Sequence, residues 1–198
     1  MTQKEGSSSR QTLARTIAES MAVKERLFEA CSSVFEQLVE ATVSAFSKGN
    51  KMLLCGNGGS ACDAQHVAGE LVGRFLKDRH PLPAIALSAA DSILTCVGND
   101  YSFADVFARQ VQALAQPGDI VVGISTSGNS PNVIRAIEVA RQCQAVCVGF
   151  TGAEGGKLRE ITDICLCVPS QVTARIQEAH ITLWHALCEE IENRLFGS

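Results

Sequence analysis

The chain has 198 residues, of which 46% are hydrophobic and 19% charged, a composition ordinary for one globular α/β domain. Its formal net charge is −4 and it has no dense Lys/Arg patch, which argues against a direct nucleic-acid partner. No apolar run approaches the roughly 18 residues of a membrane span, and the polar start lacks an apolar core, so we expect no membrane partner and a cytoplasmic protein.

The first segments in chain order are a polar, Ser-rich stretch at residues 1–10 and a helical pattern over residues 11–48. We expect the first to be a disordered tail and residues 11–198 to form a single domain. Apolar side chains in the helical pattern recur every three or four residues, for example at Leu27 and Cys31. This period predicts one or two long helices.

From residue 51 the pattern changes to short apolar runs that end at turn residues. These runs predict five buried strands, at residues 52–55, 84–87, 120–124, 145–150 and 164–168. The stretches between and after them predict helices, at residues 61–76, 103–114, 131–142, 155–161 and 173–195. Strands that alternate with helices predict a doubly wound, five-stranded parallel sheet of the flavodoxin-like α/β class, with helices on both faces.

Two loops have a composition suited to an anion, at the carboxyl ends of strands where ligands bind in such sheets. The glycine loop, residues 56–60, follows the first strand and consists of Gly56, Asn57, Gly58, Gly59 and Ser60. Its glycines let backbone N–H groups approach a ligand. Ser60, with Asp63 three residues later, is typical of a helix start.

The hydroxyl loop, residues 125–130, follows the third strand and consists of Ser125, Thr126, Ser127, Gly128, Asn129 and Ser130. Ser130 is predicted at the N-cap of the next helix, with Pro131 at its first position. Four hydroxyls then face the positive end of a helix, which can hold a phosphate without Lys or Arg. Either loop alone could be an ordinary turn, but two of them at the same sheet edge favour an anion site.

A dinucleotide is the rival ligand, because Gly56, Gly58 and Ala61 pass a permissive version of the nucleotide-binding glycine fingerprint. That fingerprint also needs an acidic residue at the end of the second strand. The nearest acid, Asp91, lies well beyond the usual interval of about 20 residues after the glycines. The sequence therefore favours a phosphate over a dinucleotide.

Two predicted helices carry ionisable residues that could do chemistry. His66 and Glu70 are four residues apart and share a helix face, with Arg74 one turn further. For this segment in isolation, a solvated Glu70–Arg74 pair beside a core histidine is the favoured interpretation. The last helix places several polar groups in an otherwise apolar stretch, namely Gln177, Glu178, His180 and His185. A buried imidazole there would need a partner, so the two helices together favour a functional cluster.

Five phrases of the chain carry a family resemblance: CGNGGSACDAQH, LPAIALS, VGNDYSF, GISTSGNSPNVIRA and TARIQEAHITLWH. In this order they resemble the phosphoheptose isomerases of the sugar-isomerase (SIS) superfamily, from about residue 20 to the end. The resemblance implies an SIS fold and a typically homotetrameric enzyme. It also implies conversion of sedoheptulose 7-phosphate into D-glycero-D-manno-heptose 7-phosphate for heptose biosynthesis, such as that of the lipopolysaccharide core.

The resemblance further implies roles for individual residues. Substrate and phosphate contacts correspond to Asn57, Gly58, Gly59, Ser60, Glu70, Asn99, Asp100, Ser125, Thr126, Ser127, Ser130 and Gln177. A zinc site with one ion per subunit corresponds to His66, Glu70, Gln177 and His185. Glu70 and His185 are also the implied catalytic pair, and His180 matches a family position without an assigned role.

Aldose–ketose isomerisation moves a proton between adjacent carbons through an enediolate. We expect Glu70 to be the base and His185 to act at the oxygen, with zinc either a Lewis acid or structural. Gln177 and His185 are eight residues apart, which is about 12 Å along a helix. One ligand of the implied zinc is therefore expected from a neighbouring subunit.

A non-catalytic alternative in the same superfamily is a regulator similar to the DnaA initiator-associating protein. We expect such a regulator to lack an acid and an imidazole at the positions of Glu70 and His185, so their presence favours the enzyme. The loops indicate a phosphate but not the length of a sugar, so isomerisation of another phosphosugar stays open.

Overall fold

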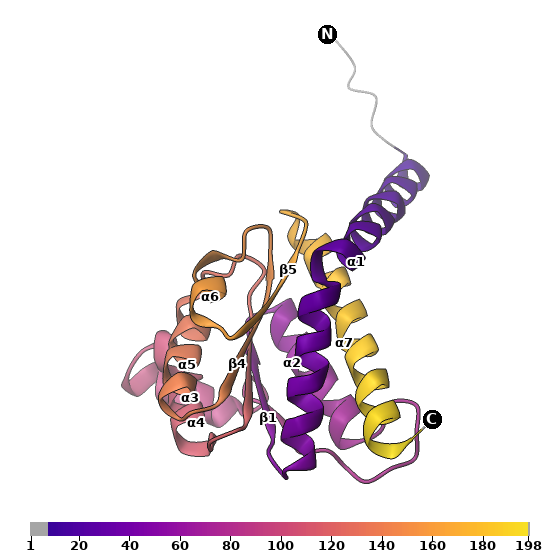
Figure 1. Cartoon of the computed structure of the whole chain (residues 1–198). Coiled ribbons are helices and arrows are strands. Elements are labelled where there is room, and N and C mark those ends of the chain that lie inside the picture. Colours follow the sequence, from indigo (N-terminus) through magenta and orange to yellow (C-terminus); the bar gives the residue numbers. More distant parts are fainter. Residues whose placement is uncertain (1–7, 198) are drawn as a thin grey trace.

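A computed structural model describes residues 8–197 as a five-stranded sheet between two layers of helices (Figure 1). The strands are β1 (Met52–Gly56), β2 (Ala84–Ala86), β3 (Ile120–Ile124), β4 (Val146–Gly152) and β5 (Ile164–Val168). All neighbours pair in parallel, in the order β2-β1-β3-β4-β5. The predicted doubly wound parallel sheet is confirmed, and each predicted apolar run forms a strand.

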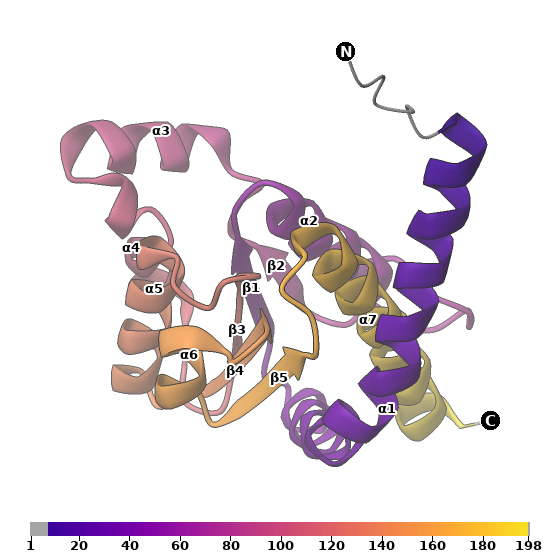
Figure 2. The same ribbon diagram turned by 90° about the horizontal axis from the view of Figure 1, so that it is seen from above.

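The helices are α1 (Ser9–Ser47), α2 (Gly59–Val72), α3 (Asp91–Asp100), α4 (Ala108–Leu114), α5 (Pro131–Gln142), α6 (Gly156–Ile161) and α7 (Thr173–Phe196), with a 3-10 turn at Phe103–Asp105. Helices α1, α2 and α7 cover one face of the sheet, and α3 to α6 lie over the other (Figures 1 and 2). Alternate residues of β1 serve the two cores: Met52 and Leu54 face the first layer, Leu53 and Cys55 the second. No helix within residues 8–197 is long and apolar enough to span a membrane.

The N-terminal segment is one continuous helix, which packs on α7 and β5. It begins at Ser9, two residues before the predicted start, because Ser8 and Gln11 form a capping box. The Gln11 side chain accepts a hydrogen bond from Ser8 N at 2.8 Å, and Ser8 Oγ accepts one from Gln11 N at 3.3 Å. The rest of the predicted tail, residues 1–7, lies outside the described residues.

Four local predictions differ from the structure. The predicted helix over residues 103–114 is instead a 3-10 turn at Phe103–Asp105 followed by α4, which begins at Ala108. The start of α2 has Gly58 at the N-cap, with a φ of 55°, and Ser60 lies inside the helix rather than at its cap. The same helix ends at Val72, before the predicted end at residue 76. Helix α3 was not predicted; it buries Val97 and packs the partly buried Leu94 against the same core.

Candidate active site

The two loops predicted to bind an anion lie side by side. Gly56 of β1 is in register with Ile124 of β3, so Asn57 and Ser125 begin their loops at adjacent positions of the carboxyl edge. From this edge the chain enters α2 on one face of the sheet and α5 on the other. Strands β1 and β3 therefore flank a topological switch point, which is where ligands bind in open α/β sheets.

A reciprocal pair of amides joins the two loops. Asn57 Nδ2 donates to Asn132 Oδ1 at 2.9 Å, and Asn132 Nδ2 donates to Asn57 Oδ1 at 2.8 Å. Asn132, in the first turn of α5, is only 2% exposed. Sequence reasoning missed Asn132, and the available signal was an amide placed directly after the predicted N-cap serine and Pro131. The pair fixes the spacing between the glycine loop and the hydroxyl loop.

The hydroxyl loop gathers its serines around Ser125. Ser125 Oγ lies 2.8 Å from Ser130 Oγ and 3.4 Å from Ser127 Oγ. Ser130 is the N-cap of α5, as predicted, but its side chain makes no capping hydrogen bond. The positive end of α5 and these hydroxyls therefore remain available to an anion. The Thr126 carbonyl accepts a hydrogen bond from Gly152 N at 3.1 Å, which ties the loop to β4.

The glycine loop is closed on one side by α7. A Cβ atom built on Gly59 would lie 2.3 Å from Gln177 Nε2, so the Gln177 amide packs directly on the start of α2. Ser60 is 4% exposed, and its N–H donates to the Asn57 carbonyl at 3.1 Å. The structure therefore places Gln177 beside the glycine loop.

A second cluster, the α2–α7 seam, consists of His66, Glu70 and His185. The two imidazole Nε2 atoms lie 3.0 Å apart, and Glu70 Oε1 is 3.4 Å from His66 Nε2. The side chains of His66 and Glu70 are 45% and 26% exposed, so the seam opens to solvent. This local convergence was predicted from the four-residue spacing on α2 and from the last helix.

The two clusters occupy different levels of the same helix pair. Helices α2 and α7 each follow a parallel strand, so they run in the same direction, with Gln177 opposite Gly59 and His185 opposite His66. Seven residues of α2 separate Gly59 from His66, which is about 10 Å along the helix. Gln177 is thus not gathered with the other three implied zinc ligands in one chain.

Two further implied substrate contacts lie elsewhere. Asn99 and Asp100, at the end of α3, are exposed and hydrogen-bonded to each other at 2.8 Å. The Asn99 amide and the Cys96 thiol lower the pKa of Asp100. Helix α3 and helix α7 lie over opposite faces of the sheet (Figure 2). The structure does not bring this pair to the seam.

His180 has a packing role. Its Nε2 lies 3.0 Å from the carbonyl oxygen of Thr151 on β4, and its ring meets the Phe150 ring edge-on at 5.6 Å between centroids. The side chain is fully buried, and burial lowers its pKa to about 4. A neutral, buried imidazole of this kind holds α7 against the sheet.

The seam offers part of a metal donor set. In tetrahedral zinc sites each histidine nitrogen lies at about 2.0–2.1 Å from the ion, which places two nitrogens roughly 3.3 Å apart. The observed separation between His66 Nε2 and His185 Nε2 is 3.0 Å, with the carboxylate of Glu70 beside them. Among residues 8–197, no group of three or more His, Cys, Asp and Glu side chains is arranged to hold a metal ion. The seam therefore offers residue types that zinc accepts, two imidazoles and a carboxylate, without a formed metal site in one chain.

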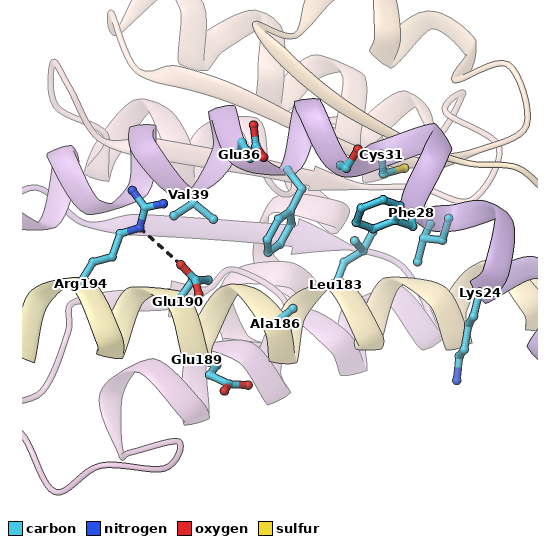
Figure 3. Close-up of a pocket in the computed structure, with 13 residues that line it drawn as sticks. Lys24, Phe28, Cys31, Glu36, Val39, Leu183, Ala186, Glu189, Glu190 and Arg194 are labelled. Atoms are coloured by element: carbon cyan, nitrogen blue, oxygen red, sulfur yellow. Dashed lines mark hydrogen bonds and ion pairs between the residues drawn. The ribbon is translucent and has the colours of Figure 1, made fainter. Parts of the chain in front are cut away.

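A separate groove of about 610 Å³ lies between α1 and α7, away from both clusters (Figure 3). Its floor is apolar and includes Leu27, Phe35 and Leu183. Glu190 and Arg194 form an ion pair at one end of it, with an N···O distance of 3.4 Å. The groove is lined by no member of either cluster.

Comparison with known proteins gives consistent matches along most of the chain. The family model described as SIS domain matches residues 17–152. The phosphoheptose isomerase of Roseiflexus sp. is 55% identical over 180 residues, which is 91% of either chain. That of Aquifex aeolicus is 53% identical over 174 residues, or 88% of this chain and 91% of the relative. The solved phosphoheptose isomerase of Neisseria gonorrhoeae superposes with a TM-score of 0.89 at 42% identity, over 94% of this chain and all of that one.

Proposed function

Since the chain belongs to the SIS-domain family and, within it, to the phosphoheptose isomerases, we propose that it converts sedoheptulose 7-phosphate into D-glycero-D-manno-heptose 7-phosphate in the cytoplasm. The reaction is an aldose–ketose isomerisation that serves heptose biosynthesis. The observation that carries this proposal is identity of 55% to a relative of that name over 91% of both chains. The loops at the switch point supply the phosphate chemistry that such a substrate needs.

The phosphate is held by the hydroxyl loop and the N-terminus of α5. Ser125, Ser127 and Ser130 bring three hydroxyls together, and the helix dipole stabilises the negative charge. Asn57 and Gln177 border this site from the glycine loop and from α7. These groups are neutral donors, so they fix the phosphate by geometry more than by net charge.

Glu70 moves the proton between the two carbons. Its carboxylate is partly exposed and can reach a substrate proton, while an imidazole beside it can protonate and stabilise the enediolate oxygen. His185 is the imidazole for that role, and His66 orients it across the 3.0 Å contact. Glu70 and His185 thus supply the two groups that the reaction requires, a carboxylate at the carbons and an acid at the oxygen.

Zinc is a proposed cofactor, one ion per subunit, held by His66, Glu70 and His185. When bound, it would supply Lewis-acid polarisation of a substrate oxygen or a structural link between the helices. The family resemblance implies that the fourth ligand is the side-chain amide of Gln177. In the same chain, however, Gln177 lies at the level of the glycine loop and not at the seam. We propose that a second copy of the chain completes the donor set.

The same reasoning supports a homotetramer. In one chain, Glu70 follows Gly59 of the glycine loop by eleven residues along α2. This separation is about 16 Å along the helix, which is long for one sugar phosphate. Helix α1 also exposes an apolar stripe of Leu13, Ile17, Met21 and Phe28, each at least half exposed. This stripe continues into the groove of Figure 3. A second copy of the chain that covers the stripe and the groove would bring its own hydroxyl loop and seam close to those of the first copy.

Turnover of the purified chain with sedoheptulose 7-phosphate tests the activity, with the aldose product followed by NMR in the presence of zinc or a chelator. We expect conversion by the wild type and none by His185→Ala. Light scattering should give a mass four times the 21.1 kDa of one chain, and Phe28→Glu should reduce it. An intact, zinc-loaded oligomer that leaves this sugar unchanged would move the assignment to another phosphosugar or to a regulatory role.

A further inference from the structure

A buried carboxylate on α7 captures the segment that follows α2. Glu192 Oε1 accepts a hydrogen bond from Phe75 N at 3.0 Å, and Glu192 Oε2 accepts from Leu76 N and Lys77 N, both at 2.9 Å. The Glu192 side chain is 1% exposed. This capture also explains why α2 ends before the predicted residue 76, because these amides bond to α7 and not to the preceding turn of α2.

Arg79 completes the connection between the two helices. Its Nε donates to Glu192 Oε1 at 2.9 Å, and its Nη1 and Nη2 donate to the carbonyls of Leu71 and Glu70 at 2.7 and 2.9 Å. The guanidinium therefore satisfies carbonyls in the last turn of α2, which otherwise lack partners. One buried ion pair thus links the residue that carries the catalytic carboxylate directly to α7.

The captured segment also places a ring against the catalytic imidazole. Phe75 and His185 are stacked, with centroids 5.5 Å apart and planes inclined by 26°. His185 also meets His66, at a centroid distance of 5.2 Å, with the planes tilted by 48°. The His185 ring therefore contacts both Phe75 and His66, while Glu192 holds the Phe75 backbone in place.

We propose that Phe75, Arg79 and Glu192 are positioning residues for the isomerase reaction, which together set the orientation of His185 relative to Glu70. The proposal rests on the proposed function, in which these two side chains move protons. None of the three touches the reacting atoms. They act by restricting the imidazole ring and by fixing the end of α2 against α7, and small displacements of catalytic groups are costly to the chemical step.

Asp119 provides a matched control at the other edge of the sheet. Its side chain is also 1% exposed, accepts hydrogen bonds from Lys51 N at 3.0 Å and Gln116 N at 2.8 Å, and pairs with Lys51 Nζ at 2.6 Å. Asp119 thus resembles Glu192 in burial, in amide partners and in its cation. It lies before β3, at the amino edge, and bonds to no residue of the seam.

The kinetic test compares Glu192→Gln with Asp119→Asn and Phe75→Leu with Phe75→Tyr. We expect both carboxylate variants to lower the melting temperature, but only Glu192→Gln to lower kcat, by about 10- to 100-fold with KM changed less than about 3-fold. Phe75→Leu should lower kcat in the same way, and Phe75→Tyr, which keeps the ring, should retain it. An unchanged kcat in Phe75→Leu, or an equal loss in Asp119→Asn, would overturn the proposal.

A second readout does not depend on activity or on zinc. Diethyl pyrocarbonate modifies neutral imidazoles, and mass spectrometry of the metal-free protein gives the rate for each histidine separately. We expect Phe75→Leu and Glu192→Gln to raise the rate at His185 several-fold, with the exposed His80 unchanged as an internal reference. Unchanged His185 reactivity would overturn the positioning role. Absence of turnover by the wild type, with this reactivity change present, would instead refute only the proposed function.

Discussion

The hydroxyl loop and the α2–α7 seam solve two different problems within one chain. The loop is made of consecutive residues at the end of one strand, and its groups are hydroxyls and a helix terminus. The seam brings together His66 and His185, which are 119 residues apart, through a helix pair that a buried ion pair holds in place. The comparison shows that a phosphate-binding loop can be formed by one short stretch of consecutive residues. The geometry for proton transfer instead depends on the packing of two helices that are distant in sequence.

The largest effect that distinguishes the two regions should come from Glu70→Gln. Loss of the proton-transferring carboxylate should lower kcat by about 10²–10⁴-fold and leave KM nearly unchanged. Steady-state kinetics with sedoheptulose 7-phosphate measures both constants. Glu160→Gln, an exposed acid on α6, is the control and should retain full activity. A variant Glu70→Gln that keeps the wild-type kcat would remove the seam from the chemistry.

Acid should weaken both regions together, because His180 lies on α7 between Gln177 and His185. Its folded pKa of about 4 is below the unfolded value of 6.5, so its contribution to stability is complete above pH 6.5. As the pH falls from 6.5 towards 4, the unfolded chain binds a proton that the folded chain excludes. We expect a loss of up to about 3 kcal/mol in that window. Urea unfolding at several pH values measures it, and a flat profile between pH 6.5 and 4 would contradict the assignment.

Two glycines with positive φ sharpen the comparison within the binding region. Gly128, with φ +68°, would place a Cβ 1.9 Å from the Gly155 carbonyl oxygen, whereas Gly58, with φ +55°, has open space. Gly128→Ala should cost at least about 2 kcal/mol and Gly58→Ala about 1 kcal/mol, because only the first adds a backbone clash to the strain. Thermal unfolding of the two variants tests this order. Equal costs would mean that the hydroxyl loop is less tightly packed than the contact with Gly155 indicates.

A smaller effect than that of Gly128→Ala is expected on substrate affinity. Ser130→Ala removes one of the hydroxyls at the start of α5 and should raise KM by roughly 10-fold, the worth of one hydrogen bond to a charged group, with kcat little changed. Ser44→Ala, at an exposed position of α1, is the matched control. If Ser130→Ala lowered kcat and left KM unchanged, the separation of binding from chemistry would fail.

Much of the fold could be predicted because its signals are local. The five strands are short, fully apolar runs between turns, and the hydroxyl loop shows its chemistry in consecutive residues. Helix α3 escaped prediction because it is short and its apolar face is small, with Val97 buried and Leu94 partly buried. The end of α2 escaped because amides 75–77 bond to Glu192, more than a hundred residues away. Asn132 escaped for the same reason, since its role depends on a partner in another loop.

The neutral character of the hydroxyl loop has a consequence for how the substrate arrives. The loop contains no Lys or Arg, the ammonium of nearby Lys157 is paired with Glu138, and the chain as a whole is acidic. A dianionic sugar phosphate is therefore not drawn in from a distance, since long-range steering needs a field of opposite sign. Its association rate should not fall as the ionic strength rises, because there is no attraction for salt to screen. Such a site discriminates by fit after collision, and other polyanions of the cell would have no electrostatic advantage in competing for it.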